Sequence, residues 1–242
     1  MKARQTETTS RYDVVWNCAT SSISITMKLE WNFESDVTDA ERVAFQRRFR
    51  AATLTKWNGH GYRLSASRAV DKLARAKASV RPSKSWTDPE WAIPLDGFGL
   101  PPDITVSIGI LDTRVGEHWD VEVCRDSERS QVDRLLDNID VGLNDSDLTL
   151  QHEFGHALGA PDEYDECVNG SQTPVLCDMR NWTRPSDRFS DTSALMSAGD
   201  LVRARYFYSV RDRVNAWTQK RYLFQVRPLR GGDSAMEDAT EA

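Results

Sequence analysis

The run from His152 to Tyr164, HEFGHALGAPDEY, constrains the fold of this 242-residue chain more than any other segment. His152 and His156 are four residues apart, so on a helix they lie one turn apart on the same face. Gly159 can adopt the positive φ that ends a helix sharply, and Pro161 cannot continue one. We therefore predict a helix that carries both histidines and stops at about Gly159.

The same residues predict a metal site. Two neutral imidazoles at this spacing can bind one Zn²⁺ ion, and Glu153 lies beside the first of them, where it can take a proton from a zinc-activated water. Half of the chain's four histidines fall in this run. The alternatives are a surface helix that binds no metal and a zinc-binding protein without activity, although the intact Glu153 gives no support to the latter.

Catalytic zinc usually has three protein ligands and one open position. No histidine follows His156, and after Glu166 the next glutamate is Glu237, near the end of the chain. This elimination favours Asp162, three residues after the glycine, as the third ligand. Asp162 could instead be a turn residue or a surface carboxylate. The weaker alternatives for the third ligand are Glu163, Asp178, Asp187, Asp191 and Asp200.

The pattern His-Glu-x-x-His-x-x-Gly-x-x-Asp resembles the signature of metzincin zinc peptidases in its aspartate-ligand, snapalysin-like form. Metzincins carry a methionine turn after this motif, and the segment 193–197, SALMS, resembles that turn. The resemblance implies that Met196 forms a hydrophobic floor under the metal without binding it. It also implies that the Tyr164 hydroxyl assists the developing oxyanion, although simple packing is the alternative for Tyr164. No tyrosine lies two residues after Met196, where some metzincins place one.

The match is strong over 152–164 and weaker over 193–217. Together with the order of expected elements, it implies an α+β fold: a metzincin-like twisted mixed sheet with the active-site helix, then a smaller C-terminal lobe with the methionine turn and a final helix. We expect one peptidase domain over 1–230, with an upper lobe at 11–159 and a lower lobe at 160–230. Residues 231–242 are predicted to be a disordered acidic tail.

Hydrophobic alternation and turn residues predict the remaining elements. A capping box at Thr38–Glu41 begins a helix that ends at 57–59. Residues 130–143 are either a short helix or the edge strand with which metzincins hold substrate. Residues 1–10 are expected to be loose, 68–80 helical, and 81–103 and 165–192 irregular. Strands are expected at 22–33, 62–65, 104–111 (the clearest buried strand) and 119–124, and a final amphipathic helix with Tyr206, Val210, Val214 and Trp217 on one face.

The composition is that of a globular protein, with 39% hydrophobic and 28% charged residues. A net charge of −6 gives no basic field for nucleic acid, and no stretch approaches the roughly 20 apolar residues of a membrane span. The first seven residues lack the apolar core of a signal peptide. We therefore expect a monomer that is secreted or injected without a classical signal peptide, with the cytoplasm as the alternative.

The motif residues with Leu195, Met196, Ser197 and Gly199 also loosely resemble metallopeptidase effectors of bacterial contractile injection systems. This resemblance implies an effector or toxin whose partners include a delivery apparatus or an inhibitor. Four cysteines leave the redox compartment open: Cys167 and Cys177 could bridge one loop, Cys18 and Cys124 could pair across distant strands, or all could be free thiols. His60 and His118 are expected to have structural or surface roles.

These observations predict a zinc-dependent endopeptidase that acts on a protein or peptide, with one catalytic Zn²⁺ held by His152, His156 and Asp162. Glu153 is the expected general base, and Tyr164 the expected aid to the oxyanion. Two rival interpretations stay open. One is a zinc amidase or deacylase with a non-protein substrate, and the other is a catalytically idle binding module that zinc stabilises.

Overall fold

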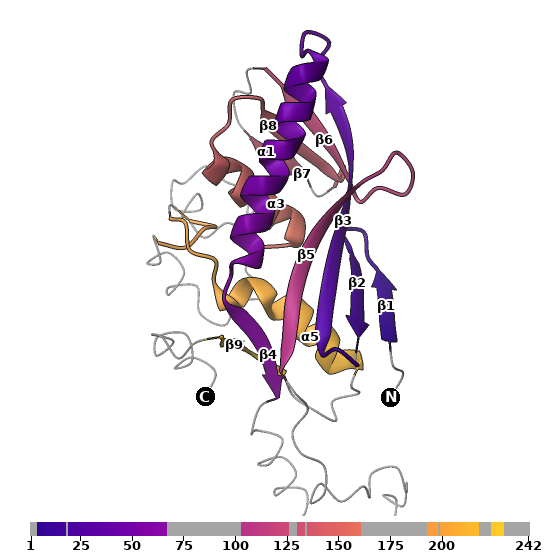
Figure 1. Cartoon of the computed structure of the whole chain (residues 1–242), viewed down its shortest axis with the longest axis vertical. Coiled ribbons are helices and arrows are strands. Elements are labelled where there is room, and N and C mark those ends of the chain that lie inside the picture. Colours follow the sequence, from indigo (N-terminus) through magenta and orange to yellow (C-terminus); the bar gives the residue numbers. More distant parts are fainter. Residues whose placement is uncertain are drawn as a thin grey trace, which may run out of the picture.

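The computed structural model shows an α+β fold in which helices cover one face of a mixed sheet (Figure 1). Within the described part of the chain, nine strands form the sheet in the order β7-β8-β6-β3-β5-β4-β9, and β1 and β2 extend it beside β3. The structure describes residues 4–17, 19–66, 103–125, 130–133, 135–160, 193–197, 199–217 and 224–229.

Three strands precede the first helix, five strands lie between α1 and α3, and one strand follows the last helix in the described part of the chain. The strands are β1 Arg4–Thr8, β2 Asp13–Asn17, β3 Ser22–Phe33, β4 Tyr62–Ala66, β5 Ile104–Asp112, β6 Trp119–Cys124, β7 Gln131–Asp133, β8 Asn138–Gly142 and β9 Phe224–Pro228. The helices are α1 Asp39–Asn58, α3 Asp147–Leu158, the 3₁₀ helix η4 Ala204–Phe207 and α5 Tyr208–Trp217. None of these helices is long and apolar enough to cross a membrane.

Strand β3 is the centre of the sheet. It is parallel to β5 on one side, and on the other side it pairs with β2 and then with β6. Its alternation of apolar and polar residues buries every second side chain from Ile23 to Leu29, as the sequence predicts. The buried side chains face the helices, and the polar ones lie on the opposite, open face.

Helix α1 covers the buried face. Thr38 and Glu41 form the predicted capping box, in which the Thr38 amide donates to Glu41 Oε2 at 2.8 Å. Phe45 and Phe49 then pack edge-on against Trp31 of β3, with ring centroids 6.2 and 5.3 Å apart. This packing fixes α1 across the sheet and provides a surface for α3, whose Phe154 contacts Phe49.

The described residues of the segment 130–143 form two strands and no helix, so the helical alternative is wrong there. Strand β8 is parallel to β6, whereas the short strand β7 is antiparallel to β8 and lies at the edge of the sheet. Strand β7 also contacts α3. The edge of the sheet is therefore beside the helix that carries the histidine motif.

Two predictions are wrong in part. Residues 4–8 form β1, although 1–10 were expected to be loose, because their backbone pairs with β2 while the RQTET sequence has no apolar alternation that could reveal a strand. Strand β5 is only half-buried, since Thr105 and Ser107 point to the open face. Strands β2 and β9 were not predicted. Cys124 is a free thiol, so it forms no bridge with Cys18.

Several predictions lie outside the described residues. They are the helix at 68–80, the loops at 81–102 and 165–192, the acidic tail at 231–242, and the bridge between Cys167 and Cys177.

His118 forms hydrogen bonds with β3 at the point where β3 changes its pairing partner from β2 to β6. Its backbone amide donates to the Lys28 carbonyl at 2.9 Å, and its Nδ1 accepts from the Lys28 amide at 3.0 Å. Since Nδ1 accepts, the neutral ring carries its proton on Nε2, which lies 3.4 Å from Asp13 Oδ1. His118 is buried, so its role is structural, as predicted.

Burial lowers the pKa of His118 below 6.5, and the nearby Asp13 carboxylate opposes this shift only in part. The unfolded chain therefore binds more protons than the folded one as the pH falls through about 6.5, and the free energy of unfolding decreases there. We expect a loss of stability between about pH 7.5 and about pH 5, measured by urea unfolding, and a smaller loss in His118→Gln. His60→Gln should reduce this loss as well, because burial also lowers the pKa of His60. Equal pH dependence in wild type and His118→Gln would contradict this role.

Candidate metal centre

Helix α3 is built by local signals on both sides of the motif. Ser146 is the N-cap, and its Oγ accepts from the Thr149 amide at 3.1 Å. Before it, Asp145 is held by the Gly142 amide, which donates to its carboxylate at 2.6 Å. Leu150 and Phe154 are fully buried against the core. These contacts fix where α3 begins after β8 and which of its faces is turned toward the core.

This orientation of α3 places the motif residues on its buried side. The rings of His152 and His156 have centroids 4.8 Å apart and lie nearly perpendicular, at 86°. His156 is 9% exposed and Glu153 is 6% exposed. Burying an imidazole and a carboxylate together is costly unless each has polar partners.

The Nδ1 atom of each of these two histidines lies close to a backbone carbonyl oxygen. Nδ1 of His152 lies 2.8 Å from the carbonyl oxygen of Leu195, and Nδ1 of His156 lies 2.9 Å from that of Ala160. A carbonyl can only accept, so both Nδ1 atoms donate and the lone pair of each neutral ring is on Nε2. This is the tautomer and the anchoring that metal-binding histidines require. The donor set therefore fits a zinc ion held through two Nε2 atoms.

The turn after α3 supplies one of these carbonyls. Gly159 adopts φ +104°, as the sequence predicts for a sharp helix end. The Gly159 amide donates to the His156 carbonyl at 2.8 Å, and the Ala160 amide donates to the Gly155 carbonyl at 2.9 Å, which is a Schellman motif. This motif turns the Ala160 carbonyl back toward the His156 ring. The glycine thus helps to set the orientation of the His156 ring as well as the end of the helix.

A second turn, at 193–201, supplies the other carbonyl. The Ser197 amide donates to the Ala194 carbonyl at 3.0 Å, and the Leu195 amide donates to the Leu201 carbonyl at 2.8 Å. Ala194, Leu195 and Met196 are fully buried. The turn that the sequence singles out around Met196 therefore lies directly against the histidine motif.

Gly155 lets the helix approach this turn. A Cβ at position 155 would overlap Met196 Sδ and would lie 2.8 Å from Trp57 Cζ2. Trp57 is itself fully buried, and its Nε1 donates to the Gln151 carbonyl of α3 at 3.0 Å. Only a glycine between the two histidines leaves room for Met196 and Trp57.

The structure thus brings together His152, Glu153, His156 and Met196. Asp162 and Tyr164, the expected third ligand and oxyanion residue, lie outside the described residues. Sequence reasoning missed Trp57 and the two backbone carbonyls. A glycine inside a helix destabilises it by roughly 0.5–1 kcal/mol relative to alanine, and this cost at Gly155 was a signal of close packing.

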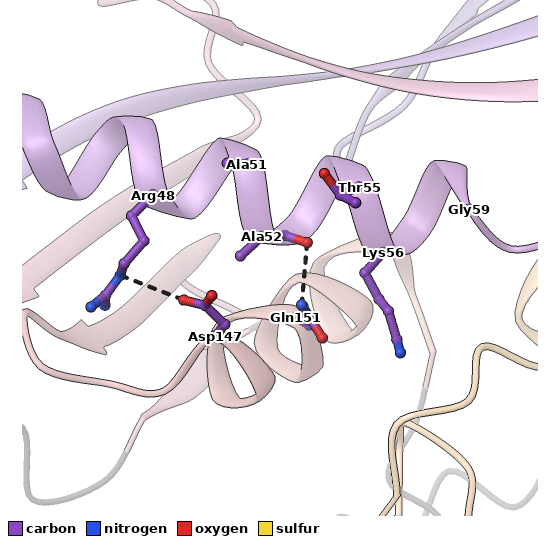
Figure 2. Close-up of a pocket in the computed structure, with 8 residues that line it drawn as sticks. All are labelled: Arg48, Ala51, Ala52, Thr55, Lys56, Gly59, Asp147 and Gln151. Atoms are coloured by element: carbon purple, nitrogen blue, oxygen red, sulfur yellow. Dashed lines mark hydrogen bonds and ion pairs between the residues drawn. The ribbon is translucent and has the colours of Figure 1, made fainter.

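A surface groove of about 460 Å³ lies between α1 and α3, on another side of α3 (Figure 2). Its charged groups already have partners: Arg48 faces Asp147 at 3.7 Å, and Lys56 faces Asp200 at 3.4 Å. Gln151 crosses the groove and donates to the Ala52 carbonyl at 3.3 Å. The groove therefore belongs to the contact between the two helices, and the histidines do not line it.

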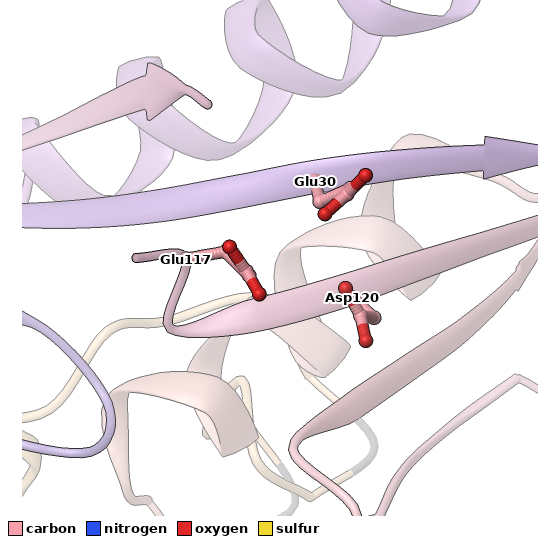
Figure 3. Close-up of side chains that lie close together, drawn as sticks. All are labelled: Glu30, Glu117 and Asp120. Atoms are coloured by element: carbon pink, nitrogen blue, oxygen red, sulfur yellow. The ribbon is translucent and has the colours of Figure 1, made fainter. Parts of the chain in front are cut away.

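Three carboxylates meet on the open face of the sheet, where Glu30, Glu117 and Asp120 each place an oxygen within 4.8 Å of the others (Figure 3). Glu30 and Asp120 are register partners on β3 and β6, and they alternate with the buried Leu29 and Val121. Their side chains therefore point away from the core on which α3 packs. Such a cluster could bind a cation, but exposed acidic groups often gather without one, and it is separate from the histidine motif.

Comparisons with protein-family models, with curated proteins and with solved structures found no match to this chain.

Gly155→Ala should disturb the centre through packing alone. The added methyl group must displace Met196 or Trp57, so we expect a loss of about 1–3 kcal/mol in the free energy of unfolding. Gly109→Ala is the control, since a Cβ there meets only the Ile25 carbonyl oxygen at 3.9 Å. Urea unfolding measures both variants. A Gly155→Ala protein as stable as wild type would show that the turn does not pack against α3 in this way.

Proposed function

We propose that the protein is a zinc-dependent endopeptidase of the metzincin type. The observation that carries this proposal is the pair of backbone carbonyls that orient the two imidazoles of the motif, 2.8 Å from His152 Nδ1 and 2.9 Å from His156 Nδ1. A surface helix with incidental histidines has no need of two buried carbonyls aimed at its rings. The fully buried Met196 beside the motif adds support.

In this proposal His152 and His156 would hold the ion through Nε2, with Asp162 as the third ligand. When bound, the zinc would supply Lewis acidity toward a water molecule and toward the carbonyl oxygen of the peptide bond to be cleaved. The buried carboxylate of Glu153 would take one proton from the water as the water oxygen adds to the carbonyl carbon. Glu153 would then give this proton to the amine nitrogen as the C–N bond breaks. Tyr164 would donate a hydrogen bond to the oxyanion.

The edge strand β7 offers a place for the substrate backbone. It is antiparallel to β8, lies at the edge of the sheet and contacts α3. An extended peptide that adds to this edge forms main-chain hydrogen bonds that do not depend on its side chains. Such a peptide would lie beside the helix that carries Glu153. We also propose, from the sequence resemblance alone, that the enzyme acts as an effector or toxin after secretion or injection.

Glu153→Ala should abolish hydrolysis and keep zinc. The carboxylate moves protons in this mechanism and does not bind the metal, so we expect a loss of at least about a hundredfold in the cleavage of a fluorogenic peptide library. Zinc content is measured by mass spectrometry after dialysis. Glu122→Ala, which removes an exposed glutamate of β6 outside the centre and outside the carboxylate cluster, is the matched control. Full activity in Glu153→Ala would show that the proposed base is wrong.

Assays of peptide cleavage, non-protein amide cleavage and zinc binding separate the peptidase from its two rivals. A zinc amidase or deacylase would leave all peptides intact and cleave a non-protein amide in a Glu153-dependent way. An idle binding module would retain zinc, lose thermal stability on chelation and cleave neither substrate. Cleavage of peptides that a chelator abolishes supports the peptidase.

Asp162→Ala should weaken zinc binding about tenfold or more, because it removes one of three protein ligands. Competition with a chromogenic chelator measures this affinity, and Asp191→Ala is a control from the weaker candidates. Unchanged affinity in Asp162→Ala would assign the third ligand to another carboxylate.

A further inference from the structure

Tyr206 connects η4 to the turn beneath the histidine motif. Its hydroxyl accepts a hydrogen bond from the Met196 amide at 3.2 Å. Met196 is fully buried and Tyr206 is 7% exposed, so this hydrogen bond is shielded from water. A shielded amide that loses its acceptor is left with an uncompensated polar group, so the bond constrains the turn.

The amide of Met196 and the carbonyl of Leu195 belong to one peptide group. That carbonyl accepts from His152 Nδ1 at 2.8 Å. A trans peptide group is planar, so its N–H and C=O point in opposite directions and rotate together. Tyr206 and His152 therefore hold opposite ends of the same plane, and rotation away from Tyr206 also turns the carbonyl away from the imidazole.

The ring of Tyr206 is tied to helix α3 through Trp57. It packs against Trp57, with ring centroids 5.9 Å apart, and Trp57 Nε1 donates to the Gln151 carbonyl, one residue before His152. The Tyr206 ring and the Leu195–Met196 peptide group are therefore both held against α3. Donation by an amide also polarises its carbonyl, which strengthens the bond that the carbonyl accepts.

We propose that Tyr206 is a positioning residue of the metal centre: its hydroxyl orients the Leu195–Met196 peptide group, which in turn holds His152 in the orientation and tautomer that bind zinc. This inference rests on the proposed zinc site. It requires neither peptide hydrolysis nor a particular third ligand. Tyr206 itself contacts neither metal nor substrate in this role.

The test is Tyr206→Phe, which removes the hydroxyl and keeps the ring against Trp57. We expect about tenfold weaker zinc binding by chelator competition, which is the lower end of the effect of removing groups that orient metal ligands. We also expect a changed visible absorption spectrum of the cobalt-substituted protein, because the coordination geometry relaxes. Tyr208→Phe, two residues away, removes the hydroxyl of a ring that stacks on Arg211, and it should bind zinc as the wild type does.

The outcomes separate this inference from the proposed function. Wild-type zinc affinity and an unchanged cobalt spectrum in Tyr206→Phe would overturn the inference, even if the variant were less stable. Weaker zinc binding in Tyr206→Phe but not in Tyr208→Phe supports it, whether or not the wild type cleaves peptides. If the wild type cleaves no peptide yet shows this difference, only the proposed peptidase activity fails. A wild type that binds no zinc overturns both.

A measurement on the wild type keeps the inference testable if Tyr206→Phe does not fold. Coupling between two sites is reciprocal, so zinc binding must also strengthen the bond from the Met196 amide to Tyr206. We expect zinc to slow hydrogen exchange at the Met196 amide more than at the Val37 amide, which donates to Glu34 in a distant turn at 3.1 Å. Equal slowing at both amides would overturn the inference.

Discussion

Two hydrogen bonds from imidazoles to backbone carbonyls determine what this structure can do. Each orients a ring of the histidine motif and leaves the lone pair of the neutral ring on Nε2, which is the tautomer that a metal-binding histidine requires. Neither carbonyl comes from the helix that carries the histidines. One belongs to the turn after α3 and the other to the turn around Met196, so the centre exists only when three segments of the chain are folded together.

The packing of these three segments depends on a glycine inside α3. Gly155 gives α3 a surface without a side chain, and Met196 and Trp57 occupy that space. The close approach lets the Leu195 carbonyl reach His152. The long strand β3 and helix α1 provide the rigid support on which α3 lies (Figure 1). The sheet is thus the scaffold, and the site is assembled along its covered face beside the edge strand β7.

Local signals in the sequence predicted much of this arrangement. The glycine at 159 defines the end of α3, and the capping box at Thr38 defines the start of α1, because each acts within one turn of the backbone. Strand β1 was missed because an edge strand is held by pairing with its neighbour and needs no apolar pattern.

The partners of the motif were not predictable for a related reason. The sequence predicted that Tyr206 lies on the apolar face of the final helix; the structure buries it, but in the 3₁₀ helix η4 that precedes α5. Its hydrogen bond with Met196, ten residues earlier, depends on how η4 meets the turn, and no spacing rule encodes that contact. The same holds for Trp57, which the sequence placed at the end of α1 without its contact with Gly155. Tertiary packing decides such interactions.

The most direct test of the central claim is X-ray absorption at the zinc edge of the purified, zinc-loaded protein. We expect about one ion per chain, two imidazole nitrogens in its coordination shell, oxygen atoms as the remaining ligands and no sulfur. His152→Ala should remove one imidazole from the spectrum. A shell with sulfur, or one in which His152→Ala leaves both imidazoles in place, would contradict a zinc site built on this histidine pair.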